Sequence, residues 1–333
     1  MTENENIKLK KKAAIISLLV GLGMFAAKTT AYLITGSNAI FSDAAESVVH
    51  VMATTMALYS IILSSRPPDK SHLYGHGNIE YFSAGIEGLL IVIAAVTIIY
   101  TSVQDIIIGA IPEKLGTGTM IIAAAGIINL FLGFYLIKKG KQTHSLALVA
   151  DGKHVLTDSY TSIGVIVGLV LVMLTDFYLL DPIFAIGVAL NILYTGYKLM
   201  RESIGGLMNE TDKESLKTLV DKLVVMKKDY WIDVHHLRFW KSAEKIFVDF
   251  HLTLPYYFNI KKSHVEEEVI VEDLNKVFYE AQVRIHLDYC YPELCKYCDY
   301  FPCEVREDEK TISIEWNTEK LIGDPIEEKT HDT

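Results

Sequence analysis

The feature of this sequence that most constrains its fold is a series of long apolar runs, all of which lie before about residue 200. The runs span residues 13–34, 39–63, 84–108, 120–137, 146–174 and 182–200. A helix needs about 20 apolar residues to cross the hydrocarbon core of a bilayer, and most of the runs reach that length. They predict an all-α membrane domain of six transmembrane helices, and they exclude both a single soluble domain and a disordered chain.

Basic residues predict the orientation of this domain, because loops rich in Lys and Arg stay in the cytoplasm. One side holds Lys8, Lys10, Lys11, Lys12, Arg66, Lys70, Lys138, Lys139, Lys141, Lys198 and Arg201, and the other side holds Lys114. We therefore expect both termini in the cytoplasm. The first apolar run is too long for a signal peptide, and the short opposite loops favour a prokaryotic inner membrane.

The sequence changes character after about residue 200. Residues 211–227 read as an amphipathic helix that Thr211 caps, with Glu214 completing a capping box, and residues 262–280 read as a second helix. Three β-rich segments, residues 234–240, 245–254 and 282–287, read as strands. This order predicts a small cytoplasmic α+β domain with a three-stranded sheet covered on one face. The predicted domains are residues 1–204, residues 205–288 and a tail, residues 289–333, whose end from about residue 323 we expect to be disordered.

Ionisable residues inside the apolar runs point to a site, because such groups are costly in lipid. Glu46 and His50 lie in the second run, and His154 and Asp158 lie in the fifth. Each pair is spaced i, i+4 and so projects from one helix face. Two such faces would offer two imidazoles and two carboxylates to Zn²⁺, Fe²⁺, Co²⁺, Mn²⁺ or Cd²⁺. The alternative is a buried polar network between helices. Further ionisable residues in or near the runs are Lys28, Asp43, Glu87 and Asp151.

Five segments resemble a known family when they are taken in order. They are residues 36–46 (GSNAIFSDAAE), 74–81 (YGHGNIEY), 154–159 (HVLTDS), 234–238 (VHHLR) and 285–288 (IHLD). The chain resembles the cation diffusion facilitators from its first apolar run to about Asp288. The resemblance implies a homodimeric antiporter that exchanges divalent metal ions for protons and has a metallochaperone-like cytoplasmic domain.

The resemblance places the transport site on Glu46, His50, His154 and Asp158. The second-helix pair departs from the family pattern, which has His or Asp first and Asp second, so Asp43 is an alternative ligand. The implied function is efflux of a divalent metal ion, zinc foremost. Iron, manganese, cobalt or cadmium as the main substrate, and a metal sensor or scaffold that does not transport, remain as alternatives.

The resemblance also implies metal sites outside the membrane. In the loop between the second and third runs, Asp69, His72 and His76 match the family's ligand positions. The matching positions of the C-terminal domain are His235, His251, His264, His286 and Asp288. Metal bound there can join two protomers. Because neighbouring residues of a strand point to opposite faces, we expect His236 to face away from His235. Structural histidines are the alternative at both sites.

The tail holds all four cysteines, Cys290, Cys295, Cys298 and Cys303, in the pattern C-x4-C-x2-C-x4-C. Disulfides are rare on the cytoplasmic side of a membrane. The compact spacing favours a structural zinc site with four thiolate ligands, and an iron–sulfur cluster or free thiols remain open. This tail lies outside the family resemblance.

Other classes of protein fit the sequence poorly. A formal net charge of −10 without a basic stripe argues against nucleic-acid binding. A membrane metalloprotease would need a motif such as H-E-x-x-H, which the chain lacks. We therefore expect a transporter and not an enzyme, with lipid, protons and divalent cations as its partners.

Overall fold

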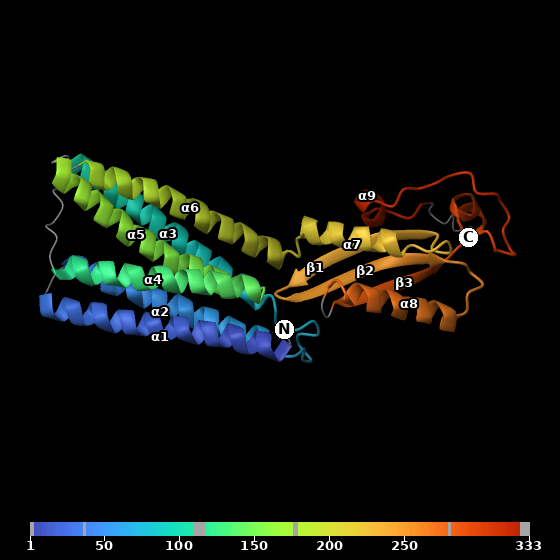
Figure 1. Ribbon diagram of the computed structural model, residues 1–333, viewed down its shortest axis with the longest axis horizontal. Coiled ribbons are helices and arrows are strands. Elements are labelled where there is room, and N and C mark those ends of the chain that lie inside the picture. Colours follow the sequence, from blue (N-terminus) through green and yellow to red (C-terminus); the bar gives the residue numbers. More distant parts are fainter. Residues whose placement is uncertain (1–2, 36–37, 109–116, 176–178, 279–280, 327–333) are drawn as a thin grey trace. The chain divides into compact units, whose positions relative to one another are not determined.

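The computed structural model describes residues 3–35, 38–108, 117–175, 179–278 and 281–326 (Figure 1). Within some helices the side chains of further residues, including Asp43 and Glu46, lie outside the described part. The chain divides into two compact units, Met1–Met208 and Asn209–Thr333. The sequence predicted this boundary four residues earlier, at residue 204.

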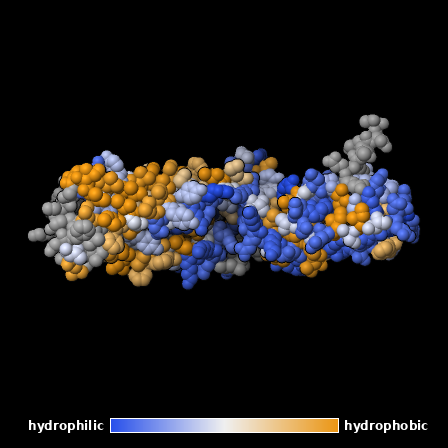
Figure 2. All heavy atoms as spheres, turned by 90° about the horizontal axis from the view of Figure 1, so that it is seen from above, coloured by the Kyte–Doolittle hydropathy of each residue, from blue (hydrophilic) through white to orange (hydrophobic). Residues whose placement is uncertain are grey.

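The first unit consists of helices that lie side by side (Figure 1). They are α1 (Glu3–Thr35), α2 (Asn38–Ser64), α3 (Ile79–Ile108), α4 (Thr117–Gln142), α5 (Leu146–Thr175) and α6 (Leu180–Leu207). In the described part of the chain, three spans are long and apolar enough to cross a membrane: Glu5–Thr30, Ile79–Ile108 and Pro182–Leu207. Large apolar side chains cover much of the visible surface of this unit (Figure 2). These features define a membrane domain, and the number of six spans stays a prediction.

Glycines bring two pairs of helices into backbone contact. A Cβ atom placed on Gly133 of α4 would lie 3.0 Å from the carbonyl oxygen of Gly152 on α5, and the reverse distance is also 3.0 Å. Gly88 of α3 and Gly196 of α6 face each other in the same way, at 3.2 and 3.1 Å. Small residues at such crossings are typical of helices packed in membranes. The α4–α5 contact fixes the helix that carries His154.

A buried ion pair joins several helices of the first unit. The ammonium group of Lys10 on α1 lies 3.6 Å from a carboxylate oxygen of Glu80 on α3, and both side chains are buried. Ser64 at the end of α2 donates to the same carboxylate at 2.7 Å, and Ser145, just before α5, donates to its second oxygen. The hydrogen bonds satisfy a charge that would otherwise be costly to bury. Lys10, predicted as a basic flanking residue, is therefore part of the packed interior.

The second unit is a small α+β fold. Its elements are α7 (Lys213–Met226), β1 (Asp233–Ser242), β2 (Lys245–Leu254), α8 (Ile260–Asn275), β3 (Gln282–Tyr289), the 3-10 helix η1 (Pro292–Tyr297) and α9 (Thr318–Ile322). The strand order is β1-β2-β3, with β1 antiparallel and β3 parallel to β2. Parallel strands need a crossover connection, and α8 supplies it. The predicted order of helices and strands up to β3 matches the structure.

One face of the sheet forms the hydrophobic core of this unit. Buried residues of β2 on this face are Val248, Phe250, Leu252 and Leu254, and α7 and α8 cover them with Leu219, Leu223, Ile270 and Leu274. Because side chains alternate along a strand, His251 lies on the opposite face. The sheet therefore separates an apolar face from a face that carries histidines.

Two details of the helix starts differ from the sequence prediction. Asp212, not Thr211, caps α7, since its side chain accepts from the backbone N–H of Glu214, while the Thr211 hydroxyl donates to the Phe239 carbonyl. The α8 helix starts earlier than predicted, because Asn259 caps it by accepting from the backbone N–H of Lys262. Local side-chain hydrogen bonds set both boundaries.

Candidate metal centres

In the membrane domain, His50 of α2 and His154 of α5 lie next to each other. Their ring centroids are 5.5 Å apart, and the two residues are 4% and 7% exposed. Nε2 of His50 has no hydrogen-bond partner among the described residues. Imidazole nitrogens bind Zn²⁺ at about 2.0–2.1 Å, and the separation of the two rings is compatible with one nitrogen of each binding the same ion. His50 thus faces the interior of the helix bundle.

The carboxylates predicted for this site are seen only in part. Asp158 lies one turn after His154 on α5 and is half-buried. The side chains of Glu46 and Asp43 lie outside the described residues. The structure therefore brings His50 and His154 together, and the choice between Glu46 and Asp43 stays a prediction.

Two further carboxyl groups of the membrane domain are fully buried. Asp151 lies one turn before His154 on α5, and its Oδ1 is 3.2 Å from the Thr54 hydroxyl. Glu87 of α3 is also fully buried, and neither of its carboxylate oxygens has a hydrogen-bond partner among the described residues. Buried carboxyl groups in a membrane domain commonly mark an ion or proton path. The sequence showed them only as acidic residues in or beside apolar runs, and the predicted site does not include them.

The loop between α2 and α3 gathers the three residues predicted there. Asp69 Oδ1 lies 3.2 Å from His72 Nδ1, Asp69 Oδ2 lies 3.3 Å from His76 Nε2, and the two imidazole centroids are 4.3 Å apart. The backbone N–H groups of Ser71 and His72 donate to Asp69 and, with the His72 ring, lower the pKa of this carboxyl. The loop thus holds a charged carboxylate between two imidazoles, and one ligand atom of each residue lies within 4.8 Å of the others.

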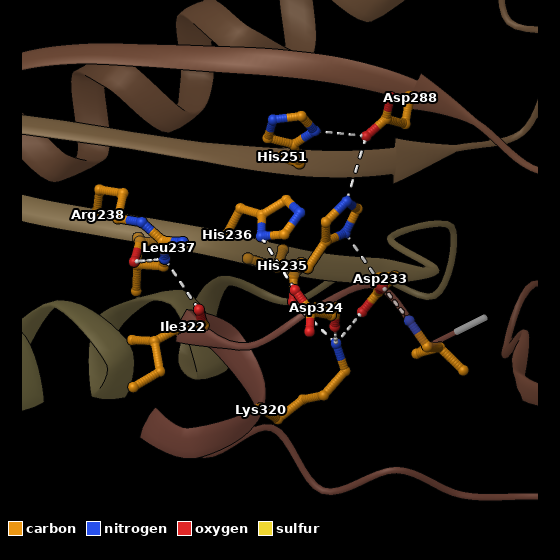
Figure 3. Close-up of polar contacts among 12 residues, drawn as sticks. Asp233, His235, His236, Leu237, Arg238, His251, Asp288, Lys320, Ile322 and Asp324 are labelled. Carbon is orange, nitrogen blue, oxygen red and sulfur yellow. Dashed lines mark hydrogen bonds and ion pairs between the residues drawn. The ribbon is translucent and has the colours of Figure 1, made fainter. Parts of the chain in front are cut away.

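The histidine-bearing face of the second unit holds another group of possible ligands. His235 of β1 pairs with His251 of β2 (Figure 3), and His251 pairs with His286 of β3. Asp288 Oδ2 lies 2.9 Å from His251 Nδ1 and 3.5 Å from His235 Nε2. His286 is more exposed, with its ring centroid 4.5 Å from that of His251. Sheet register therefore collects His235, His251 and Asp288 at one point, with ligand atoms within 4.8 Å.

His264, which was predicted with this group, lies elsewhere. It is on α8 with its side chain 62% exposed, and its ring nitrogens are 3.3 and 3.6 Å from Glu267 and Glu268. It lines a different pocket, which Glu267, Tyr256 and Asp288 also line. The structure therefore does not bring His264 to His235 and His251.

The expectation that His236 faces away from His235 is wrong. His236 has a φ of 52°, and the β1–β2 register shifts between His235 and Arg238, which is a β-bulge. The bulge brings the His236 ring centroid to 5.1 Å from that of His235 and 5.3 Å from that of His251. A sequence signal existed: Val234 and Leu237 are both core residues, and a regular strand places core residues two apart, not three.

The tail adds a layer behind His235 (Figure 3). Asp233 Oδ2 lies 3.1 Å from His235 Nδ1, and Asp233 Oδ1 lies 2.8 Å from the Lys320 ammonium on α9. Burial would raise the pKa of Asp233, but the contacts with His235 and Lys320 outweigh it and lower the pKa. A carboxylate on one imidazole nitrogen orients the other nitrogen toward a metal. Asp233 therefore directs His235 Nε2 toward Asp288, a role that the sequence analysis missed.

The four cysteines of the tail are free thiols. Cys290 directly follows β3, Cys295 lies in η1, Cys298 directly follows it, and Cys303 comes five residues later. Two groups of described residues have ligand atoms within 4.8 Å of one another: the loop group (Asp69, His72 and His76) and the histidine group (His235, His251 and Asp288). Neither group contains a cysteine. The four-thiolate zinc site stays a prediction.

Comparison with known proteins gives the class of this chain. Residues 14–208 match the cation efflux transmembrane domain, and residues 222–290 match the cytoplasmic domain of cation efflux proteins. The chain belongs to the cation diffusion facilitator family of divalent cation efflux transporters. It is thus an integral membrane protein.

Individual relatives differ in the metal that their names give. The uncharacterized transporter sll1263 of Synechocystis sp. is 31% identical over 84% of this chain and 91% of its own length. The manganese efflux system protein MneP of Bacillus subtilis is 27% identical over 86% and 98%, respectively. The zinc transporter ZitB of Pectobacterium atrosepticum is 25% identical over 75% and 76%. The transported metal is therefore not determined by these similarities.

Proposed function

We propose that this chain exports a divalent metal ion, zinc foremost, across a prokaryotic inner membrane in exchange for protons. The transport ligands in this proposal are Glu46, His50, His154 and Asp158. The observation that supports it is the adjacent, buried pair of His50 and His154, on two helices of a cation efflux domain. Two neutral imidazoles with two carboxylates balance the charge of one divalent cation.

The same ligands explain proton exchange. A metal ion binds the neutral imidazole and the ionised carboxylate, so its binding displaces protons and protonation releases it. Histidine titrates near neutral pH, which makes the exchange responsive to a physiological pH gradient. In the proposed cycle the metal enters from the cytoplasmic side, the site reopens to the opposite side, and protons replace the metal.

Manganese is the second candidate substrate. Carboxylate oxygens suit Mn²⁺, while imidazole nitrogens suit Zn²⁺, and the proposed site has two of each. A manganese efflux protein and a zinc transporter are both similar to this chain. We place zinc first because the two described ligands that face each other are imidazoles. Iron, cobalt and cadmium are the further alternatives.

Transport measured metal by metal in proteoliposomes with an imposed pH gradient tests this function. We expect Zn²⁺ to move against protons, and His154→Ala and Asp158→Ala to abolish both fluxes. The exposed His144, whose φ is 51°, offers a matched control. Asparagine tolerates this backbone conformation, so His144→Asn should transport normally. Absence of metal-driven proton movement for every divalent ion would favour a sensor or scaffold and overturn the proposal.

We also propose that His235, His251, His286 and Asp288 bind a divalent metal that regulates the transporter. Asp233 and Lys320 support this site through His235. His264, which is exposed on α8, remains available to a second protomer of a homodimer. Asp69, His72 and His76 form an additional proposed site in the loop that joins α2 and α3.

A further inference from the structure

The segment after β3 carries a chemistry that the proposed function does not use. Every cysteine of the chain lies between residues 290 and 303. The matched cytoplasmic domain ends at residue 290, so Cys295, Cys298 and Cys303 lie beyond it. This tail is nonetheless packed: Cys298 is 6% exposed and forms a small apolar cluster with Ile232 and Leu294.

Cys295 and Cys298 form a tight turn in which the backbone points at sulfur. The backbone N–H of Cys298 donates to the Cys295 carbonyl at 3.2 Å, and the backbone N–H of Tyr300 donates to Cys298 Sγ at 3.4 Å. An N–H group aimed at sulfur favours the thiolate, because hydrogen bonds to the charged form stabilise it. The turn thus presents Cys298 as a ligand.

Arg306, which follows the cysteine segment in the sequence, stabilises this turn through hydrogen bonds to its backbone. Its guanidinium group donates to the backbone carbonyls of Cys295 at 3.1 Å, Cys298 at 3.0 Å and Tyr300 at 3.1 Å. The planar guanidinium group can bind several carbonyl oxygens at once, because its N–H donors have a fixed geometry. The two cysteines of the turn are therefore held in a defined backbone conformation before any ligand binds.

The other two cysteines approach from the sheet. The Cys290 backbone N–H donates to the Leu254 carbonyl at 2.9 Å, which fixes Cys290 at the end of the parallel β2–β3 pair. Tyr256 and Tyr257, in the loop after β2, lie beside Cys290 and Cys303, respectively. The loop after β2 thus lies beside the first and the last cysteine of the segment.

The four thiols share one small region. Cys290 packs against the apolar cluster that contains Cys298, and the turn at Cys298 places Cys295 next to it. Thiols gathered in this way can bind a divalent cation once they are deprotonated. No three of these sulfurs lie within 4.8 Å of one another in the described chain, but a change of χ1 rotamer moves a sulfur while the backbone stays in place.

We propose that Cys290, Cys295, Cys298 and Cys303 bind one divalent metal ion of the zinc class as a tetrahedral four-thiolate site. Binding forms four metal–sulfur bonds of about 2.3 Å and releases the thiol protons to solvent. The site goes beyond the proposed transport function and does not depend on it.

The metal would fasten the tail over the histidine-bearing face of the sheet. His235 and His251 line a pocket of about 240 Å³, whose other walls include Tyr291, Leu294 and Ile326 of the tail. Tyr291 and Leu294 lie between the first two cysteine ligands in the sequence. Binding of a metal at the cysteines therefore fixes one wall of the histidine pocket.

Cobalt substitution in the purified full-length protein tests the site. All four cysteines of the chain belong to the proposed site, so any thiolate-to-cobalt signal comes from it. We expect one Co²⁺ to give a thiolate-to-cobalt charge-transfer band and the visible bands of tetrahedral cobalt. One equivalent of Zn²⁺ should remove these bands and protect all four thiols from a chromogenic thiol reagent. Cys295→Ser and Cys298→Ser should each weaken the charge-transfer band by about a quarter and lower the metal content by up to one ion per chain. Lys296→Ala, between these ligands, is the matched control and should behave as wild type.

Three results would overturn the proposal. They are a cobalt complex without a charge-transfer band, thiols that react equally fast with and without Zn²⁺, and an iron–sulfur absorption in the purified protein. Tryptophan fluorescence checks that the serine variants fold, since all three tryptophans lie in the second unit. Metal transport by the serine variants separates the two proposals: normal transport with a weakened charge-transfer band shows that the tail site is independent of the transport site.

Discussion

Asp212 combines two roles in a few atoms. It caps α7 through the backbone N–H of Glu214, and its carboxylate lies 2.8 Å from the Lys241 ammonium on β1. The hydrogen bonds from Lys241 and then Ser215 lower the pKa of Asp212 to about 2. A lowered pKa contributes stability that is present above the unfolded value of about 3.9 and is lost as the pH falls through the folded value.

We therefore expect Asp212→Ala to destabilise the second unit at neutral pH by about 1 kcal/mol, the usual cost of a lost helix cap. The difference from wild type should shrink as the pH falls from about 4 toward 2. Denaturant unfolding followed by tryptophan fluorescence measures it. Asp221→Ala, an exposed position within α7, is the control, and an equal loss in that variant would contradict the capping role.

Asp233 should act on metal binding through His235. Replacement by Asn removes the charge that pairs with Lys320 and weakens the orientation of the imidazole. Loss of such a supporting contact typically reduces metal affinity by 10–100-fold, so we expect Asp233→Asn to weaken Zn²⁺ binding at the histidine group by this factor. Competition with a chelator measures the affinity. An unchanged affinity would show that His235 does not bind the metal, or that its orientation does not depend on the Asp233 carboxylate.

The sequence predicted residues of the candidate metal centres better than the residues around them. The family resemblance singled out His235, His251 and Asp288, and the structure brings these three side chains together. His236 was missed because a β-bulge with a positive φ at this residue turns its side chain toward His235. The alternation of residues along a regular strand does not predict such a bulge. Asp233 and Lys320 lie 87 residues apart in number (320 − 233), and only the folded tail brings them together.

At the scale of elements, the contact between α4 and α5 should control the position of His154. A Cβ at Gly152 would lie 2.9 Å from the backbone nitrogen of Ile137 and 3.0 Å from the carbonyl oxygen of Gly133. Neither neighbour is a flexible side-chain end, so the helices must separate. Overpacking of this kind costs about 1–3 kcal/mol, and Gly152→Ala should lose that much stability together with much of the transport rate.

Gly23 of α1 supplies the control for this prediction. No atom outside its own helix backbone and chain neighbours lies within 4 Å of a Cβ built there, as far as the structure describes the chain. Gly23→Ala should therefore unfold at the wild-type temperature in detergent and transport normally. A Gly152→Ala protein that is equally stable and active would show that α4 and α5 tolerate separation.

Apolar patterning predicted the elements well where a core imposes it. The predicted strand 245–254 coincides with β2, because alternate residues face α7 and α8 across the sheet. Helix ends were less predictable, since Asp212 and Asn259 set them through single hydrogen bonds. The prediction of six transmembrane helices was based on hydrophobicity. In the described part of the chain, three helices are both long enough and apolar enough to cross a membrane.

At the scale of the whole molecule, metal should strengthen the dimer. A ligand that binds the dimer better than the monomer shifts the equilibrium by mass action. We expect Zn²⁺ to tighten dimerisation of the full-length protein in detergent by about tenfold, which corresponds to about 1.4 kcal/mol. His251→Ala and His286→Ala should remove this effect, and His144→Asn should keep it. Fluorescence energy transfer between labelled protomers measures the dimer affinity. An affinity that is the same with and without Zn²⁺ would contradict the prediction and would indicate that the protomers associate through apolar packing alone.

The parallel pairing of β2 and β3 sets an order of events during synthesis. The β1–β2 hairpin consists of neighbouring segments, so it can form as soon as both strands leave the ribosome, whereas β3 must wait for all of α8. The cysteines and Lys320 emerge later still. A nascent chain that stops before the tail would therefore expose a finished sheet whose histidines still lack the tail that lies against them.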